Sequence, residues 1–238
     1  MVRRFVLLAA LAACGPVPPR SARALIPAPP RLAPFAVTEL AWTPGETLQW
    51  DVRLNAIDLG RVELVTEDDE VTSTFRTNQL ASLLGATHHE LVTQVVDHHV
   101  VASHETLELG GETTAVSARF DGPRLTVDEN TRTIPGGNLA QTLHTTLAWL
   151  RAWARADAEP GFLFVLHMGE LYRLDVERPV PDERRGELAL RITARAGVYG
   201  SKDDPVSLVL WLRDAPDRTP LEMRLASGEL VVTARLRQ

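Results

Sequence analysis

Histidine is the residue type in this chain that most readily does chemistry, and five of the seven histidines fall between residues 88 and 104. Neutral imidazole is the commonest metal ligand that proteins use. If the segment were one strand, His98 and His104 would share a face about 20 Å apart, at roughly 3.3 Å per residue. If the chain instead turns near Asp97, His104 lies opposite Leu91 and diagonal to His89, within about 7–8 Å. His89 and His104 are therefore the candidate pair of metal ligands.

A third ligand for that pair is missing, because alternation along the strands places Glu90 and Glu105 on the opposite face. The sequence also contains neither the HExxH nor the paired CxxC spacing of common zinc sites. We therefore predict no metal site and no cofactor. The segment is interpreted as a polar hairpin exposed to solvent.

Cys14 is the single cysteine, and the residues before it form a leader. Arg3 and Arg4 precede eight apolar residues at 5–12, far fewer than the roughly 20 that a helix needs to cross a bilayer. A short apolar run after positive charge is typical of a signal peptide. The run ends in Leu11-Ala12-Ala13-Cys14, which looks like the lipobox of bacterial lipoproteins. The alternative is an ordinary secretory signal in which the cysteine is incidental.

The lipobox likeness implies cleavage after residue 13 and a diacylglyceryl group on the thiol of Cys14. Each buried CH₂ of an acyl chain contributes about 0.8 kcal/mol, so two or more chains anchor a protein stably. Gly15 stands where an aspartate would retain a lipoprotein in the inner membrane of enteric bacteria. We therefore predict a lipid-anchored protein of the cell envelope, in the outer membrane and facing the periplasm.

Composition divides the rest of the chain at residue 44. Residues 14–43 contain seven of the 16 prolines, which favours an extended spacer, so we expect a tether there and a domain at 44–238. Since the whole chain carries −6 and residues 1–43 carry +4, residues 44–238 carry −10. Such a domain repels phosphate backbones, so a nucleic-acid partner is not expected.

Alternation of apolar and polar residues begins after Pro44 and predicts half-buried strands. Leu48, Trp50 and Val52 are apolar, whereas the residues between them are polar. The pattern returns at 172–177, 188–195, 208–212, 221–225 and 230–236. Near Gly60 the apolar positions change parity, which a glycine bulge would explain. We predict a mainly β fold, a curved antiparallel sheet or open β-barrel of the lipoprotein-carrier kind.

One segment has helical spacing instead. Asn138 is the expected cap of a helix that runs to about Ala156 and packs on the sheet. Its apolar face is expected to comprise Leu139, Leu143, Leu147, Leu150 and Ala154. Trp149 and Trp153 lie beside that face and either belong to the core or line an apolar pocket. The candidate pocket residues are Leu139, Leu143, Leu147, Trp149 and Trp153.

Residues 44–237 resemble a family of bacterial envelope proteins catalogued as domain of unknown function 3108. The likeness rests on Gly45–Val52, on Asp58–Leu64 and on Ile134-Pro135 before the helix, and its longest motif is Leu210–Leu221. The chain departs from the family at 181–186. No catalytic residues are attached to that family, so the resemblance implies none here.

Motifs of catalysis do not occur in the sequence, which has no GxSxG elbow and no Walker-type loop. We therefore expect a non-enzymatic, membrane-anchored periplasmic lipoprotein that binds a hydrophobic or lipid ligand in envelope maintenance. The alternative is a structural or protein-interaction module of an envelope assembly. An open cavity at the candidate pocket would favour the first, and a packed interior with an exposed apolar patch would favour the second.

Overall fold

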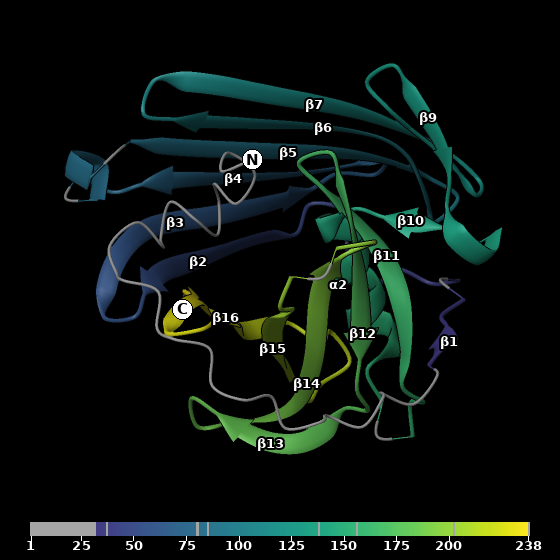
Figure 1. Ribbon diagram of the computed structural model, residues 1–238. Coiled ribbons are helices and arrows are strands. Elements are labelled where there is room, and N and C mark those ends of the chain that lie inside the picture. Colours follow the sequence, from purple (N-terminus) through teal and green to yellow (C-terminus); the bar gives the residue numbers. More distant parts are fainter. Residues whose placement is uncertain are drawn as a thin grey trace, which may run out of the picture.

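The computed structural model describes residues 32–36, 38–79, 81–84, 86–137, 139–155, 157–201 and 203–237. In these residues the chain forms one sheet of 17 strands and one α-helix, which confirms the predicted mainly β class (Figure 1). The signal peptide and Cys14 lie outside the described residues. The helix is α2 (Leu143–Trp153), and two 3-10 turns span Ala81–Leu84 and Pro135–Gly137.

The strands are short to medium in length and most of them follow one another as hairpins. In chain order they are β1 (Ala33–Pro34), β2 (Thr47–Leu54), β3 (Ile57–Thr66), β4 (Glu70–Thr77), β5 (Thr87–Val96), β6 (His99–Leu109), β7 (Glu112–Asp121), β8 (Arg124–Val127), β9 (Asn130–Thr133), β10 (Ala140–Gln141), β11 (Gly161–His167), β12 (Glu170–Val176), β13 (Val180–Arg184), β14 (Glu187–Val198), β15 (Val206–Arg213), β16 (Pro220–Ser227) and β17 (Leu230–Leu236). The order across the sheet runs from β1 and β10 through β11–β17 to β2–β9. Neighbours are antiparallel except β1 and β10, which pair in parallel with β11.

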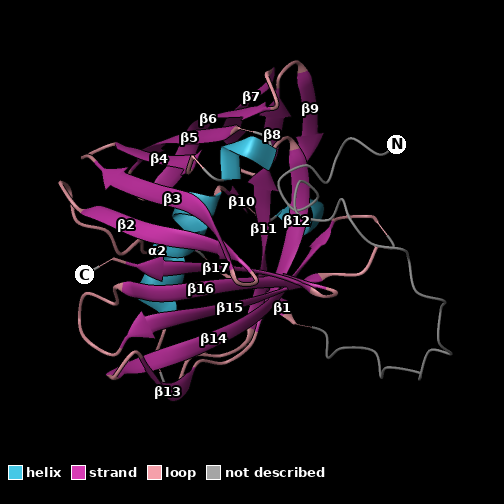
Figure 2. Ribbon diagram, turned by 90° about the vertical axis from the view of Figure 1, so that its left-hand side faces the viewer, coloured by secondary structure: helices cyan, strands magenta, loops and turns pink. Residues whose placement is uncertain are grey.

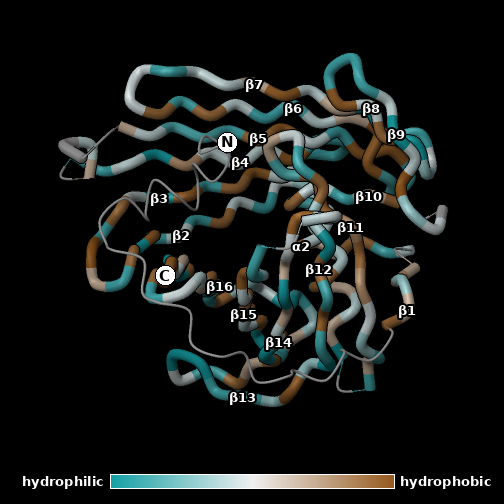
Figure 3. Tube along the Cα trace, in the orientation of Figure 1, coloured by the Kyte–Doolittle hydropathy of each residue, from teal (hydrophilic) through white to brown (hydrophobic). Residues whose placement is uncertain are grey.

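Hydrophobic and hydrophilic residues alternate along many of the strands (Figure 3), and in β2 this alternation gives one buried and one more exposed face, as the sequence predicts. In β2, Leu48, Trp50 and Val52 are all buried, and the intervening residues are more exposed. The parity change at Gly60 is also confirmed, because the register between β2 and β3 shifts after Val52.

The sheet curls into a spiral whose two ends overlap around α2 (Figures 1 and 2). Phe164 and Leu166, on one face of β11, pack against Ala118 of β7 and Leu125 of β8. Leu163 and Val165, on the other face of β11, belong to the central core with α2. Since β11 is covered on both faces, the sheet closes by packing one end against the other, without a backbone ladder between β9 and β10.

The helix α2 begins later in the chain than predicted and buries a different set of side chains at its start. Its N-cap is Thr142, whose side chain exchanges hydrogen bonds with Thr145 in a capping box, and Leu139 and Ala140 precede the helix. Asn138 lies outside the described residues. The helix ends at Trp153 with Ala154 as its C-cap, before the predicted end at 156.

The described residues before residue 44 pack on the core and do not form the extended tether that the sequence predicts. Leu40 is 8% exposed and belongs to the central core, and Phe35 and Trp42 pack against that core. Ala33–Pro34 pairs with β11, and a Cβ at Gly161 would lie 2.6 Å from the Phe35 ring. The folded unit therefore includes residues 32–36 and 38–43, where large apolar side chains pack on the core and Pro34 is the one proline. No helix among the described residues is long and apolar enough to cross a membrane.

Candidate functional site

The aromatic part of the predicted pocket exists as a ring cluster on α2. Trp149 and Trp153 stack with ring centroids 5.3 Å apart, and Phe35 lies 4.4 Å from Trp149 and 5.3 Å from Trp153. Trp149 is 4% exposed, whereas Phe35 and Trp153 are only partly buried. We call Phe35, Trp149 and Trp153 the aromatic cluster.

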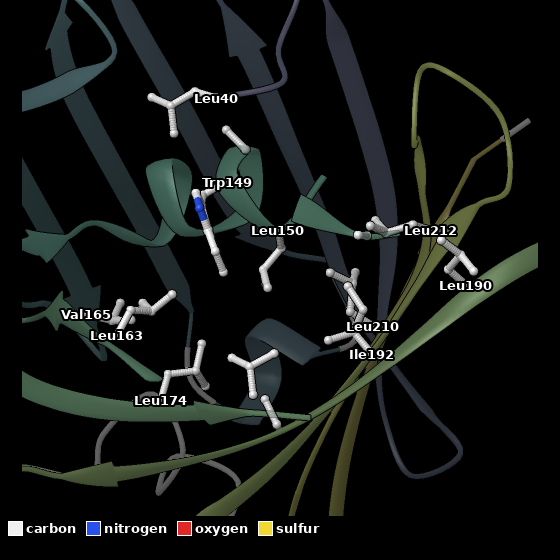
Figure 4. Close-up of a cluster of buried hydrophobic side chains, with 14 of the residues drawn as sticks. Leu40, Trp149, Leu150, Leu163, Val165, Leu174, Leu190, Ile192, Leu210 and Leu212 are labelled. Atoms are coloured by element: carbon white, nitrogen blue, oxygen red, sulfur yellow. The ribbon is translucent and has the colours of Figure 1, made fainter. Parts of the chain in front are cut away.

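The leucines of the predicted pocket divide between the interior and the surface. Leu147 is partly buried and packs on the core, but Leu139 is 36% and Leu143 is 42% exposed. The predicted leucine face is therefore wrong at the helix start, where His144 and Thr145 are buried instead. Figure 4 shows Trp149 and Leu150 extending from α2 toward the core leucines of β11, β12, β14 and β15.

A second group of side chains lies where the two ends of the sheet meet. Glu105 of β6 accepts hydrogen bonds at Oε1 from His89 Nε2 of β5 at 2.8 Å and from His167 Nδ1 of β11 at 2.7 Å. Its Oε2 accepts from the backbone N–H of Met168 at 2.6 Å. His89 and Glu105 are buried, and the side chain of His167 is 20% exposed. We call His89, Glu105 and His167 the clasp, because it joins β5 and β6 to the β11–β12 turn.

The clasp replaces the predicted pairing of His89 with His104. The expected turn at Asp97 and His98 is present, with φ of 48° and 64°. However, Val101 is an extra residue between the Val95–Val100 and Gln94–Ala102 pairs. This bulge exchanges the faces, because side chains alternate with a period of two.

As a result, Glu105 pairs with Leu91 on the inner face, and His104 pairs with Val92 on the outer face. His104 is exposed and lies 3.0 Å from Ser117 Oγ through Nδ1. His104 is therefore not a partner of His89, contrary to the prediction. The third member, His167, is 62 residues from Glu105 in sequence, and local spacing contains no signal for it.

Electrostatics make the clasp an ion pair. Burial alone would raise the pKa of Glu105, but attraction to His167 and hydrogen bonds from both imidazoles hold it far below its usual range. Burial opposes a charge on His167, yet the neighbouring Glu105 carboxylate raises the pKa of His167 above its usual value. Glu105 is thus ionised, and the positive charge on His167 is favoured.

A polar chain beside the clasp anchors the start of α2. His144 lies 3.0 Å through Nδ1 from Thr93 Oγ1 and 2.8 Å through Nε2 from Ser73 Oγ. Thr93 Oγ1 also donates to Thr142 Oγ1 at 3.2 Å. Burial, only partly offset by attraction to Glu105, lowers the pKa of His144 to about 3. His144 is therefore neutral near pH 7, and the inner faces of β4 and β5 hold the helix through hydrogen bonds.

A depression of about 340 Å³ lies elsewhere, beside the C-terminal strand. Its lining comprises Asp51, Arg53, Arg185, Arg235, Leu236 and Arg237. Arg235 Nε lies 3.1 Å from Glu222 Oε2, and Arg237 Nε lies 3.7 Å from Asp51 Oδ1. Two of its four guanidinium groups are thus paired with carboxylates in a charge ladder across the strands.

Comparison of the sequence with models of protein families and with curated proteins gives no match. Among solved structures, the chain is similar to a β-barrel-like protein of domain of unknown function 1849 from Brucella abortus. The TM-score is 0.55 at 14% identity, over 81% of this chain and 95% of that chain. This likeness shows the fold alone, and the resemblance to domain of unknown function 3108 stays a prediction.

Two further solved structures are similar over most of their length but at lower scores. A protein of the domain of unknown function 1089 family from Pseudomonas aeruginosa has a TM-score of 0.43 at 14% identity, over 80% of this chain and 95% of that chain. The lipoprotein LppX from Mycobacterium tuberculosis has a TM-score of 0.27 at 11% identity, over 83% of this chain and 85% of that chain. Scores below 0.5 support no conclusion about the present chain.

Proposed function

We propose that the protein is a lipid-anchored lipoprotein of the cell envelope whose β domain binds an acyl chain at the aromatic cluster, without catalysing a reaction. The observation that carries this proposal is how the concave face is covered. The cover consists of α2 and the segment before residue 44, which meet at Phe35, Trp149 and Trp153.

Among the described residues, few backbone bonds hold the N-terminal part of this cover to the sheet and to α2. Ala33–Pro34 forms a two-residue ladder with β11, Phe35 N donates to Phe162 O at 2.9 Å, and Ala41 N donates to Ala148 O at 3.0 Å. Segments with few hydrogen bonds open at a smaller free-energy cost than central strands. Opening here would expose Leu40, Trp42 and the aromatic cluster, a surface that suits an apolar ligand.

Anchoring follows from the sequence of the leader. Diacylglyceryl attached to Cys14 would place the cover close to the membrane, because only 20 residues lie between Cys14 and Phe35. The Gly15 position favours the outer membrane, with the domain on the periplasmic side. Incorporation of labelled palmitate by the wild type, and its loss in Cys14→Ser, is the expected result for this part of the proposal.

Acyl binding is tested on residues 32–238, exported behind a secretory signal and analysed by native mass spectrometry with lipid extraction. We expect a stoichiometric acyl species in the wild type and its loss in Trp153→Glu, because a carboxylate at this half-buried position of the aromatic cluster repels an acyl chain. Leu188→Glu is the matched control, since Leu188 is 73% exposed, and it should retain the lipid. Trp153→Ala provides a second variant, and circular dichroism verifies the fold of each.

A wild-type domain that carries no lipid and ignores added fatty acids and phospholipids would contradict acyl binding. The alternative, a protein-interaction module, is favoured by one observation: the interior is packed, while Leu139 and Leu143 are exposed where α2 begins. In that case crosslinks to an envelope protein should form at Leu143 and not at Leu188.

A further inference from the structure

The clasp has a donor set that hydrogen bonding alone does not require. Two imidazole nitrogens and one carboxylate oxygen, each from a different strand, lie within 4.8 Å of one another. Both imidazoles approach the same oxygen, Glu105 Oε1. Three ligand atoms that converge in this way are the protein part of a transition-metal site with open positions.

Two of the three separations between ligand atoms are close to those that an ion needs, and all three lie within 4.8 Å. Ligands about 2.0–2.1 Å from a tetrahedral Zn²⁺ are about 3.3 Å from one another. The two measured contacts, 2.8 Å from His89 Nε2 and 2.7 Å from His167 Nδ1 to Glu105 Oε1, are roughly 0.5 Å shorter. Rotation of the His167 side chain would widen its contact with Glu105, since His167 lies at a strand end beside a turn.

The surroundings supply what a metal site needs besides its ligands. Met168 N–H donates to Glu105 Oε2 and leaves Oε1 to face the imidazoles, which is the orienting role of outer-shell partners. His89 and Glu105 are buried, while the 20% exposure of the His167 side chain gives an ion and a water molecule a route inward. No cysteine is present among the described residues, and imidazole with carboxylate suits Zn²⁺ better than Cu⁺.

We propose that His89, Glu105 and His167 bind one Zn²⁺ ion, with water as the fourth ligand, and that the ion fastens β5 and β6 to the β11–β12 turn. The imidazole N–H groups that now donate to Glu105 lose those protons on binding. Each proton moves to the other ring nitrogen or leaves to solvent, so that a lone pair faces the metal. The ion then links the two overlapping ends of the spiral.

The test uses the full-length protein in detergent, stripped with a chelator and titrated with Zn²⁺ and with Co²⁺ as a spectroscopic probe. We expect one ion per chain, a tetrahedral Co²⁺ absorption band, and a melting temperature that rises with Zn²⁺. His167→Gln should weaken Zn²⁺ binding by more than the roughly 10–100-fold that the loss of an outer-shell partner costs, because a ligand itself is lost. Glu105→Gln should act in the same direction.

His104→Gln is the matched control, because His104 lies one residue from Glu105 but on the outer face. It should bind Zn²⁺ as the wild type does, and this excludes ordinary surface histidines as the source. If Glu105→Gln does not fold, the Co²⁺ spectrum of the wild type and the partly exposed His167→Gln still decide the matter. A wild type without a tetrahedral Co²⁺ band, or His167→Gln with unchanged Zn²⁺ affinity, would overturn the proposal.

Discussion

At the scale of single residues, the interior is polar where the first turn of α2 packs against β4 and β5. His144 is 4% exposed and finds both of its partners on the inner faces of β4 and β5. A buried imidazole that is hydrogen-bonded to hydroxyl groups is stable only while it is neutral. This makes the folded state sensitive to acid at one identifiable position.

We expect stability to fall as the pH drops from about 6 to 5, at about 1 kcal/mol per pH unit from His144. The unfolded chain takes up a proton near the ordinary histidine pKa of 6.5, but the folded chain does so only near 3. Because the unfolded state binds more protons in this range, acid favours it. His144→Gln, which cannot take up a proton, should show a flatter profile of unfolding free energy in urea.

His104→Gln serves as the control and should keep the wild-type slope, since His104 is exposed on the outer face. Between pH 6 and 5 the slope reports on His144 and not on Glu105. The stability that the low pKa of Glu105 contributes is lost only when the pH falls below about 4.5. An identical slope in His144→Gln and the wild type would contradict the assignment.

Side-chain alternation predicts which residues share a strand face, but it does not predict where a strand gains a residue. Glycine marks the shift at Gly60, so that bulge is visible in the sequence. Val101 carries no such mark, and the extra residue there moves Glu105 inward and His104 outward. Of the two histidines that the sequence pairs, His89 lies in the clasp and His104 does not, because the partners of His89 depend on a bulge and on a long-range contact.

At the scale of elements, Gly60 is a position where β3 and β4 leave no room for a side chain. A Cβ there would lie 2.0 Å from the backbone oxygen of Arg76, which cannot move without breaking the β3–β4 ladder. We expect Gly60→Ala to lower the unfolding free energy by roughly 2–3 kcal/mol, within the range for overpacked sites. Chemical denaturation measures the loss.

Gly228→Ala is the comparison for that variant. Gly228 has a φ of +58°, but nothing lies within 4 Å of its Cβ position, so only the backbone preference of about 1 kcal/mol is lost. Equal losses for the two variants would show that the clash at Arg76 is relieved by movement of the strands.

At the scale of the whole molecule, closure of the spiral could be expected only in part from the sequence. The strands and the single helix follow from local periodicity, and residues 162–166 are a continuous apolar run typical of a strand buried on both faces. Contacts between distant parts of the chain decide which strands cover β11. They also decide that Phe35, Leu40 and Trp42 join the core. The proline content of residues 14–43 instead predicted an extended tether outside the domain.

Removing residues 32–43 should therefore destabilise the domain. Burying a large apolar side chain contributes about 1.5–3 kcal/mol, and Phe35, Leu40 and Trp42 are all buried at least in part. After the entropy of ordering the segment is deducted, we expect residues 44–238 to be less stable than residues 32–238 by on the order of 3 kcal/mol. That loss is a large part of the unfolding free energy of 5–15 kcal/mol that is typical of a domain.

Urea unfolding of the two forms measures the loss. The double variant Phe35→Ala, Trp42→Ala in the longer form should reproduce most of it. If both forms unfold at the same urea concentration, the segment rests on the sheet without stabilising it, and its role as a cover that opens for a ligand would be strengthened.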